Sequence, residues 1–254
     1  MPDLPYDALA EIYDWFVPEA LLAPRGSADA FAGPIAALAP GSRVLDCAAG
    51  TGALAVGLAL RGFEVVATDA SPAMVRRTRR LADEQRAELR ALTLAWEQLA
   101  DAGFKDAFAA VFCVGNSLAH APGRRARRAA LAAMAGVLRP GGLLVLTSRN
   151  WARIRARGPA VEVGERVVTR GGRRGLTIHA WLLADGWDER HELDASVAIL
   201  GEDGSVEHRG ERLGFWPFTH EMLDEDLAAA GLQTESSSFA PGVERYLVTA
   251  RRPG

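Results

Sequence analysis

One glycine-rich turn holds residue types that could bind a nucleotide-like ligand. Gly50, Gly52 and Ala55 follow an apolar run and nominally match the G-x-G-x-x-G/A fingerprint of dinucleotide-binding turns. Asp46 argues against a diphosphate at this turn, because a carboxylate at the end of the strand opposes the negative charge that such turns bind. The same carboxylate would instead stabilise a ligand that has no phosphate and carries a positively charged amino group.

A second acid follows at the distance expected for a ribose contact. Asp69 ends the segment EVVATD, 17 residues after Gly52, where a carboxylate can accept hydrogen bonds from both ribose hydroxyls. Together with Asp46, this residue favours a nucleoside with a cationic tail over NAD or FAD. S-adenosylmethionine (SAM) has that chemistry. A glycine turn followed by a helix-capping Asp69 is the purely structural alternative.

The elements that would position these residues alternate between short apolar runs and helical stretches. The expected strands are Arg43–Cys47, Glu64–Thr68, Leu92–Trp96, Ala109–Val114 and Leu143–Ser148. Helices are expected at Ala53–Arg61, after the Ser71-Pro72 cap, and from about Gly123 to Leu138. Such alternation means right-handed crossovers, so it predicts an α/β fold with a doubly wound parallel sheet.

The pattern changes after the fifth strand and gives four segments along the chain. We expect a helical cap at residues 1–40, a SAM-binding core at 41–160, an antiparallel β insertion at 161–215, and a helix with two last strands at 216–254. The expected insertion strands are Val161–Thr169, Leu176–Ala184, Glu192–Leu200 and Val206–Leu213. The expected C-terminal elements are the helix Thr219–Ala230 and the strands Gln233–Phe239 and Glu244–Ala250. The insertion is interpreted as a lid or as an oligomer surface.

Residues 43–150 resemble the class I SAM-dependent methyltransferase family. The resemblance implies a Rossmann-like, seven-stranded, mostly parallel sheet whose last strand is antiparallel, with SAM bound across the strand ends. It implies that the methionine part lies at the glycine turn, the ribose at Asp69 and the base between Met74 and Trp96, although Trp96 could equally be a core aromatic. The implied cofactor-binding residues are Arg25, Asp46, Ala48, Gly50, Gly52, Asp69, Ala70, Met74, Trp96, Glu97 and Val114.

A second pair of motifs concerns the methyl acceptor. VFCVGNSLAH ends the fourth strand with Asn116 and His120, and RPGGLLVLTSRN ends the fifth strand with Arg149. This pair is similar to glycine N-methyltransferases and their bacterial glycine/sarcosine relatives. The resemblance implies that Arg149 holds the carboxylate of the acceptor and that Asn116 orients it. His120 is either a base for the incoming ammonium group or a structural residue of the loop.

The aromatic residues depart from that pattern. The related enzymes line the acceptor pocket with tyrosines, whereas this chain has three tyrosines and places Phe215 and Trp216 in the stretch RLGFWPF. We therefore expect a small-molecule methyltransferase, N-methylating a small amine or amino acid. The alternatives are O- or N-methylation of a larger secondary metabolite, whose apolar wall these two rings would form, and a non-catalytic SAM-binding module.

Composition narrows the partners and the compartment. The 254 residues carry a net charge of −3, so bulk electrostatics gives no reason to expect nucleic acid, and no apolar window predicts a membrane span. Two cysteines, Cys47 and Cys113, are too few for a disulfide framework, which favours the cytoplasm. The arginine clusters at 76–80 and 124–128 are interpreted as solvated helix faces, and no metal site is expected. A homo-oligomer is one arrangement that the sequence leaves open.

Overall fold

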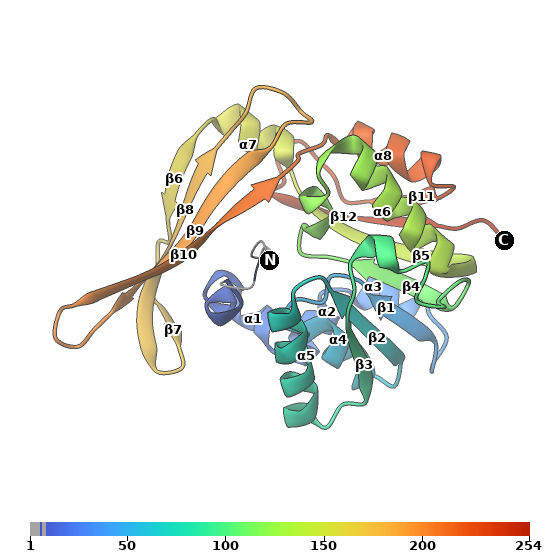
Figure 1. Ribbon diagram of the computed structural model, residues 1–254, viewed down its shortest axis with the longest axis horizontal. Helices are drawn as coiled ribbons and strands as arrows, with labels where there is room; N and C mark the ends of the chain where they lie inside the picture. The colour runs from blue at the N-terminus through green and yellow to red at the C-terminus, as the bar shows by residue number, and fades with distance from the viewer. Residues whose placement is uncertain (1–5, 7–8) are drawn as a thin grey trace.

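The computed structural model describes Tyr6 and residues 9–254, and a seven-stranded sheet forms its centre (Figure 1). The strand order is β11-β12-β5-β4-β1-β2-β3. The strand β12 is antiparallel to both of its neighbours, β11 and β5, and the pairs from β5 to β3 are parallel. The strands are β1 (Arg43–Asp46), β2 (Glu64–Asp69), β3 (Leu89–Thr93), β4 (Phe108–Cys113), β5 (Leu138–Arg149), β11 (Gln233–Ser237) and β12 (Arg245–Arg251). The α/β doubly wound fold expected from the sequence is confirmed.

Two strand boundaries differ from the sequence expectation. The strand β3 ends at Thr93, and Trp96 begins a short 3-10 helix, η3 (Trp96–Gln98), instead of ending the strand. The strand β5 begins at Leu138 and includes the Pro-Gly-Gly segment expected as a turn. The reason is a long-range partner: the amide of Gly141 donates to the carbonyl of Arg252 over 3.0 Å, so the chain after β12 extends the pairing.

Helices cover the main sheet, and their caps follow the sequence signals. The helices are α4 (Ala53–Ala59), α5 (Pro72–Gln85), α6 (Gly123–Val137) and α8 (His220–Ala229). The Ser71 hydroxyl accepts a hydrogen bond from the amide of Met74 at the start of α5, and Thr219 caps α8 in the same way. A helix that the sequence analysis did not predict, α7 (Trp151–Arg157), begins at Asn150, whose side chain accepts from the amide of Arg153.

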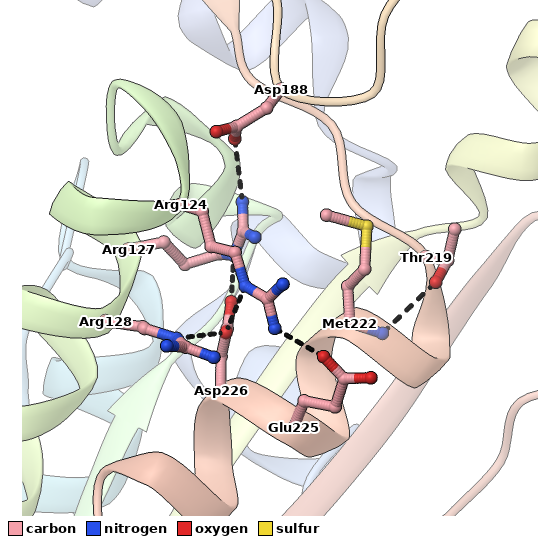
Figure 2. Close-up of polar contacts among 8 residues, drawn as sticks. All are labelled: Arg124, Arg127, Arg128, Asp188, Thr219, Met222, Glu225 and Asp226. Carbon is pink, nitrogen blue, oxygen red and sulfur yellow. Dashed lines mark hydrogen bonds and ion pairs between the residues drawn. The ribbon is translucent and has the colours of Figure 1, made fainter.

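Arginines join α6 to α8 through one buried acid (Figure 2). Asp226 of α8 is buried and accepts hydrogen bonds from Arg124, Arg127 and Arg128 of α6 at 2.6 to 2.9 Å. Arg127 is itself fully buried, with its guanidinium 4.8 Å from the centre of the Phe218 ring. The expectation of a solvated helix face is therefore wrong for Arg127, which is buried against the carboxylate of a distant helix. Arg124 and Arg128 bind the same carboxylate but keep 34% and 46% of their side chains exposed.

A second sheet follows the fifth strand and stands beside the main one (Figure 1). Its order is β10-β9-β8-β6, and β7 also pairs with β8. The strands are β6 (Ala160–Val163), β7 (Val168–Arg170), β8 (Arg173–Leu182), β9 (His191–Leu200) and β10 (Val206–Phe215). The single strand expected at 161–169 is divided in two by a turn after Gly164, whose amide donates to the carbonyl of Thr177.

The first part of the N-terminal segment lies between the two sheets, and the rest packs against the main sheet and its helices (Figure 1). Its elements are η1 (Leu9–Glu11), η2 (Tyr13–Phe16), α1 (Glu19–Leu22), α2 (Pro24–Asp29) and α3 (Ala32–Ala36). Asp14 attaches this segment both to a helix on the main sheet and to the second sheet. Its carboxylate accepts a hydrogen bond from Arg77 of α5, and its backbone carbonyl accepts one from Arg170 of β7. Arg77 is therefore also not a solvated residue, as its side chain is 20% exposed. No helix in the described part of the chain is long and apolar enough to span a membrane.

Candidate cofactor and acceptor site

Two cavities, of about 570 and 240 Å³, lie at the carboxyl ends of the parallel strands. Ala48 and Ser117 line both of them, so the two spaces are neighbours. The larger cavity follows the glycine turn and reaches Arg245 on β12, and the smaller one contains Asp69 and Trp96. This is the edge of an open α/β sheet at which ligands usually bind.

The glycine turn needs glycine at two positions for different reasons. Gly50 and Gly52 have φ angles of +56° and +87°, a region that other residues adopt with strain. A Cβ atom on Gly52 would lie 2.8 Å from Thr78, so this glycine lets α4 and α5 approach each other. A Cβ on Gly50 would meet nothing within 4 Å, because Gly50 faces the larger cavity. The turn thus leaves open space where a ligand would contact the backbone.

Asp46 presents a buried acid to the larger cavity. The residue is 1% exposed, and neither carboxylate oxygen has a hydrogen-bond partner of ordinary geometry among the described residues. Burial, followed by repulsion from Asp69, raises the pKa of Asp46 to about 7, although nearby amides oppose this rise. A cationic amino group in the cavity would supply the missing partner. The site therefore fits the ammonium end of SAM.

Asp69 and Trp96 organise the smaller cavity. The two oxygens of Asp69 accept hydrogen bonds from the amides of Gly50 and Ser71, each over 2.9 Å, which orients the carboxylate toward the glycine turn. The indole Nε1 of Trp96 donates to the carbonyl of Cys47 over 2.8 Å, so the ring is held at the end of β1. Ala70 and Glu97 line the same cavity. A nucleoside would find a flat aromatic ring and an oriented acid there.

Two residues of the implied cofactor set lie outside both cavities. Met74 is buried in α5, and Arg25 is exposed on α2; neither is among the lining residues of either cavity. Ala48 and Val114 do line the larger cavity. The contacts of Met74 and Arg25 with a cofactor stay predictions.

Asn116 and Arg149 meet at the ends of β4 and β5. Asn116 is buried with a φ of +73°, and its Oδ1 accepts a hydrogen bond from the backbone amide of Arg149 over 2.9 Å. The Arg149 guanidinium lies 5.5 Å from the centre of the Trp181 ring on β8. It forms no ion pair with a described residue, and burial, followed by repulsion from Arg245, lowers its pKa to about 10. Neither Asn116 nor Arg149 is among the lining residues of either cavity, but Arg149 lies directly opposite Arg245, which lines the larger one.

His120 is held by both ring nitrogens. Its Nδ1 lies 2.8 Å from the carbonyl of Gly214, and because a carbonyl can only accept, Nδ1 carries the proton. Nε2 is then the acceptor for the Tyr6 hydroxyl at 2.5 Å. Burial lowers the pKa of His120 to about 4, so the ring is neutral near pH 7. This arrangement favours a positioning role for His120 over that of a base.

Sequence reasoning missed Tyr6 and Arg245 as site residues. Tyr6 lines the smaller cavity beside His120, and Arg245 lines the larger one. Both residues lie far along the chain from the motifs, so no motif identifies them. The one local signal is the Pro-Gly turn that precedes Arg245 at the start of the last strand. Phe215 and Trp216 are not among the lining residues of either cavity. Phe215 packs behind His120, with ring centres 4.3 Å apart, so the expected apolar wall is not seen there.

No metal site accompanies these residues in the described part of the chain, where no group of three or more His, Cys, Asp or Glu side chains could hold an ion. The acid-containing stretch at 188–194 is used otherwise. His191 there is buried, with Nε2 2.9 Å from a guanidinium nitrogen of Arg155.

Comparisons with known proteins agree with the geometry. A family model described as a methyltransferase domain matches residues 44–142. The chain is similar to a glycine/sarcosine N-methyltransferase of Parasynechococcus marenigrum (strain WH8102), at 40% identity over 48% of this chain and 43% of that protein. It is also similar to the glycine N-methyltransferase of Mus musculus, at 31% identity over 74% of this chain and 68% of that protein. The chain thus spans less than half the length of the first relative and about two thirds of the second.

A solved structure covers the chain more fully. SAM-bound CalS10, an amino pentose methyltransferase from Micromonospora echinaspora involved in calicheamicin biosynthesis, superimposes with a TM-score of 0.71 over 99% of both chains at 22% identity. This likeness concerns the fold, including the second sheet. Together with the mouse relative and the matched domain, it leads to one conclusion: the chain belongs to the class I SAM-dependent methyltransferase family.

Proposed function

We propose that this chain methylates the nitrogen of a small amine or amino acid that carries an anionic group. The observation that carries the proposal is the Arg149 guanidinium. Arg149 ends β5, lies opposite Arg245 of the larger cavity, and forms no ion pair with a described residue. A guanidinium in this position binds a carboxylate through two parallel hydrogen bonds and so fixes its orientation. The glycine N-methyltransferase relatives support the same acceptor class.

Residues on β1, β2 and the glycine turn would hold the cofactor. When bound, SAM supplies a methyl group on a cationic sulfur that reacts with a nucleophile by in-line displacement. Asp46 would accept hydrogen bonds from its amino group, Asp69 from its ribose, and Trp96 would lie against its base. These contacts would bind the cofactor and orient its methyl group. Orientation is what a displacement with a good leaving group mainly requires from the enzyme.

The acceptor would be positioned from the other side of the cavities. Asn116 fixes the backbone of Arg149 and thereby the direction of its side chain. The Tyr6 hydroxyl, which donates to neutral His120, keeps one lone pair available for the incoming amine. Tyr6 also lines the smaller cavity beside His120, and exclusion of water from this space would favour the transfer.

The first test separates acceptor binding from cofactor binding. Arg149→Gln should raise the acceptor KM at least tenfold, because a charged hydrogen bond is lost, while the Kd for S-adenosylhomocysteine changes less than twofold. Steady-state kinetics and calorimetry measure the two quantities. Arg139→Gln, at the exposed opposite end of β5, is the matched control and should change neither. A parallel loss of acceptor and cofactor binding in Arg149→Gln would contradict the assigned role.

A larger acceptor is the second candidate, methylated on nitrogen or oxygen. The larger cavity favours it, because its volume of about 570 Å³ extends past the glycine turn to Ser238 and Arg245 near the edge of the sheet. Turnover assays with glycine, sarcosine, amino sugars and aromatic acceptors distinguish the two candidates. If SAM binds and none of these acceptors is methylated, both enzymatic proposals fail and a non-catalytic SAM-binding module is supported.

A further inference from the structure

Two arginines stand directly opposite each other on neighbouring strands. Arg149 ends β5 and Arg245 begins β12, and the antiparallel register pairs them with each other. Side chains of directly opposed residues share one face of the sheet, with Cβ atoms about 5 Å apart. Like charges in this position repel each other, so the pair destabilises the protein unless something compensates it.

No described acid compensates this pair. Neither guanidinium forms an ion pair with a described residue, whereas Arg251, on the same strand as Arg245, is bound by Glu235. Glu244 is the nearby carboxylate that favours the charged form of both arginines, and it also lies 3.6 Å from Arg153. One shared carboxylate therefore faces three guanidinium groups.

The surroundings of the pair add hydrogen-bond donors and an aromatic ring but no second acid from the described part of the chain. Trp181 lies against Arg149, and the Tyr6 and Tyr13 hydroxyls are close enough to interact with both arginines. His179 of β8 lies on the same side, where burial, followed by Arg149 and Arg245, lowers its pKa to about 4. Arg245 and Tyr13 line the larger cavity, so a ligand there reaches Arg245 directly and Arg149 through the strand register that pairs the two arginines.

We propose that the acceptor carries two negative charges, and that Arg149 and Arg245 bind them together where the main sheet meets the second sheet. Assigning these charges to the acceptor rests on the proposed function. A single carboxylate would neutralise one guanidinium and leave the other uncompensated. A dicarboxylate or a diphosphate supplies both charges, and Arg245 is then the residue that selects such an acceptor over a simple amino acid.

Calorimetry with three probes tests the site without knowledge of the acceptor. Acetate, malonate and inorganic pyrophosphate are titrated into the protein saturated with S-adenosylhomocysteine. We expect at least one of the two multivalent probes to bind tenfold or more tightly than acetate, since a second charged hydrogen bond contributes about tenfold or more. Tighter binding of malonate indicates a dicarboxylic acceptor, and tighter binding of pyrophosphate indicates a diphosphate-bearing one.

Variants assign the second charge to Arg245. In Arg245→Gln, the multivalent probes should bind no more tightly than acetate, and the Kd for acetate should change less than twofold. In Arg245→Lys, part of the difference in affinity between the multivalent probes and acetate should remain. Arg251→Gln, farther along the same strand, should behave as the wild type. Equal affinity for all three probes, or an unchanged advantage in Arg245→Gln, would overturn the proposal.

The outcome is independent of the proposed function, because none of the probes contains an amine. Tight binding of a multivalent probe, without methyl transfer to any amine tested, would retain the anion site and reject the proposed activity. Methylation of monoanionic amino acids with no preference for the multivalent probes would retain the activity and reject this site.

Discussion

The carboxylate of Asp46 lies at the end of β1, where folding alone would not favour it. Its pKa of about 7 against an ordinary value of 3.8 means that the folded protein resists ionising this group. Between these two values the unfolded chain has lost the proton and the folded chain has kept it. Stability therefore falls as the pH rises through this window, by roughly 1.4 kcal/mol for each pH unit. A cationic ligand beside the carboxylate would reverse this cost.

Asp46→Asn should therefore have opposite effects on stability and on binding. At pH 8 the ligand-free variant should be more stable than the wild type by about 2 to 4 kcal/mol, because the buried charge is gone. The difference should shrink toward pH 4, where Asp46 is protonated. SAM affinity at pH 8 should fall tenfold or more. Denaturant unfolding at several pH values and calorimetry measure both effects, and a destabilised variant at pH 8 would refute this account.

Single residues of the candidate cofactor site could be placed at the cavities from the sequence because their partners are near them in the chain. Asp46, Gly50 and Asp69 each end a strand or form a turn, and all three line the cavities. Tyr6 and Arg245 could not be identified in the same way. Their places depend on the fold of the N-terminal segment and on the register of β12 against β5, which no local pattern encodes.

At the scale of elements, Asp226 connects two helices that cover the same face of the sheet (Figure 2). Burial raises the pKa of this carboxyl, but hydrogen bonds from Arg128, Arg124 and Arg127 outweigh that effect and lower it. Its contribution to stability is therefore present above the unfolded pKa of about 3.9 and is lost as the pH falls through the lower folded value.

Asp226→Asn should destabilise the protein by about 3 kcal/mol near pH 7, because buried Arg127 would keep only a 3.8 Å ion pair with half-exposed Asp188. Denaturant unfolding measures the loss, which should become smaller below pH 4. Glu225→Gln is the control: this exposed neighbour also contacts Arg124, and its loss should cost less than about 1 kcal/mol. A similar loss of unfolding free energy in the two variants would show that burial of the carboxylate does not determine its contribution to stability.

Element types were predictable and several element ends were not. The apolar runs and the Ser71 cap placed the central strands and α5, because these signals are local. The Pro-Gly-Gly segment became part of β5 since the chain after β12 pairs with it, and Arg127 of α6 is buried because α8 carries an acid to it. Both differences result from contacts with the last 30 or so residues of the chain.

At the scale of the whole molecule, the second sheet holds the N-terminal segment over the site. Glu211 of β10 accepts hydrogen bonds from the backbone amides of Tyr6 and Leu9, at 3.1 and 2.6 Å, one on each carboxylate oxygen. Gly214 on the same strand fixes the ring of His120, to which Tyr6 donates. The second sheet thus holds Tyr6 and His120 of the smaller cavity in place, although none of its own residues is among the lining residues of either cavity.

Glu211→Ala should release this segment while the main sheet stays folded. Hydrogen exchange at the Leu9–Glu11 amides should accelerate, and turnover should fall about tenfold, because Tyr6 loses its position. The Kd for S-adenosylhomocysteine should change less than threefold, since Asp46 and the glycine turn belong to the main sheet. Glu207→Ala, on the same strand but bound to Arg173 and Arg209 at the surface, should leave turnover intact. Loss of cofactor affinity in step with turnover would instead mean that the segment belongs to the cofactor site, and unchanged exchange would mean that Glu211 does not hold it.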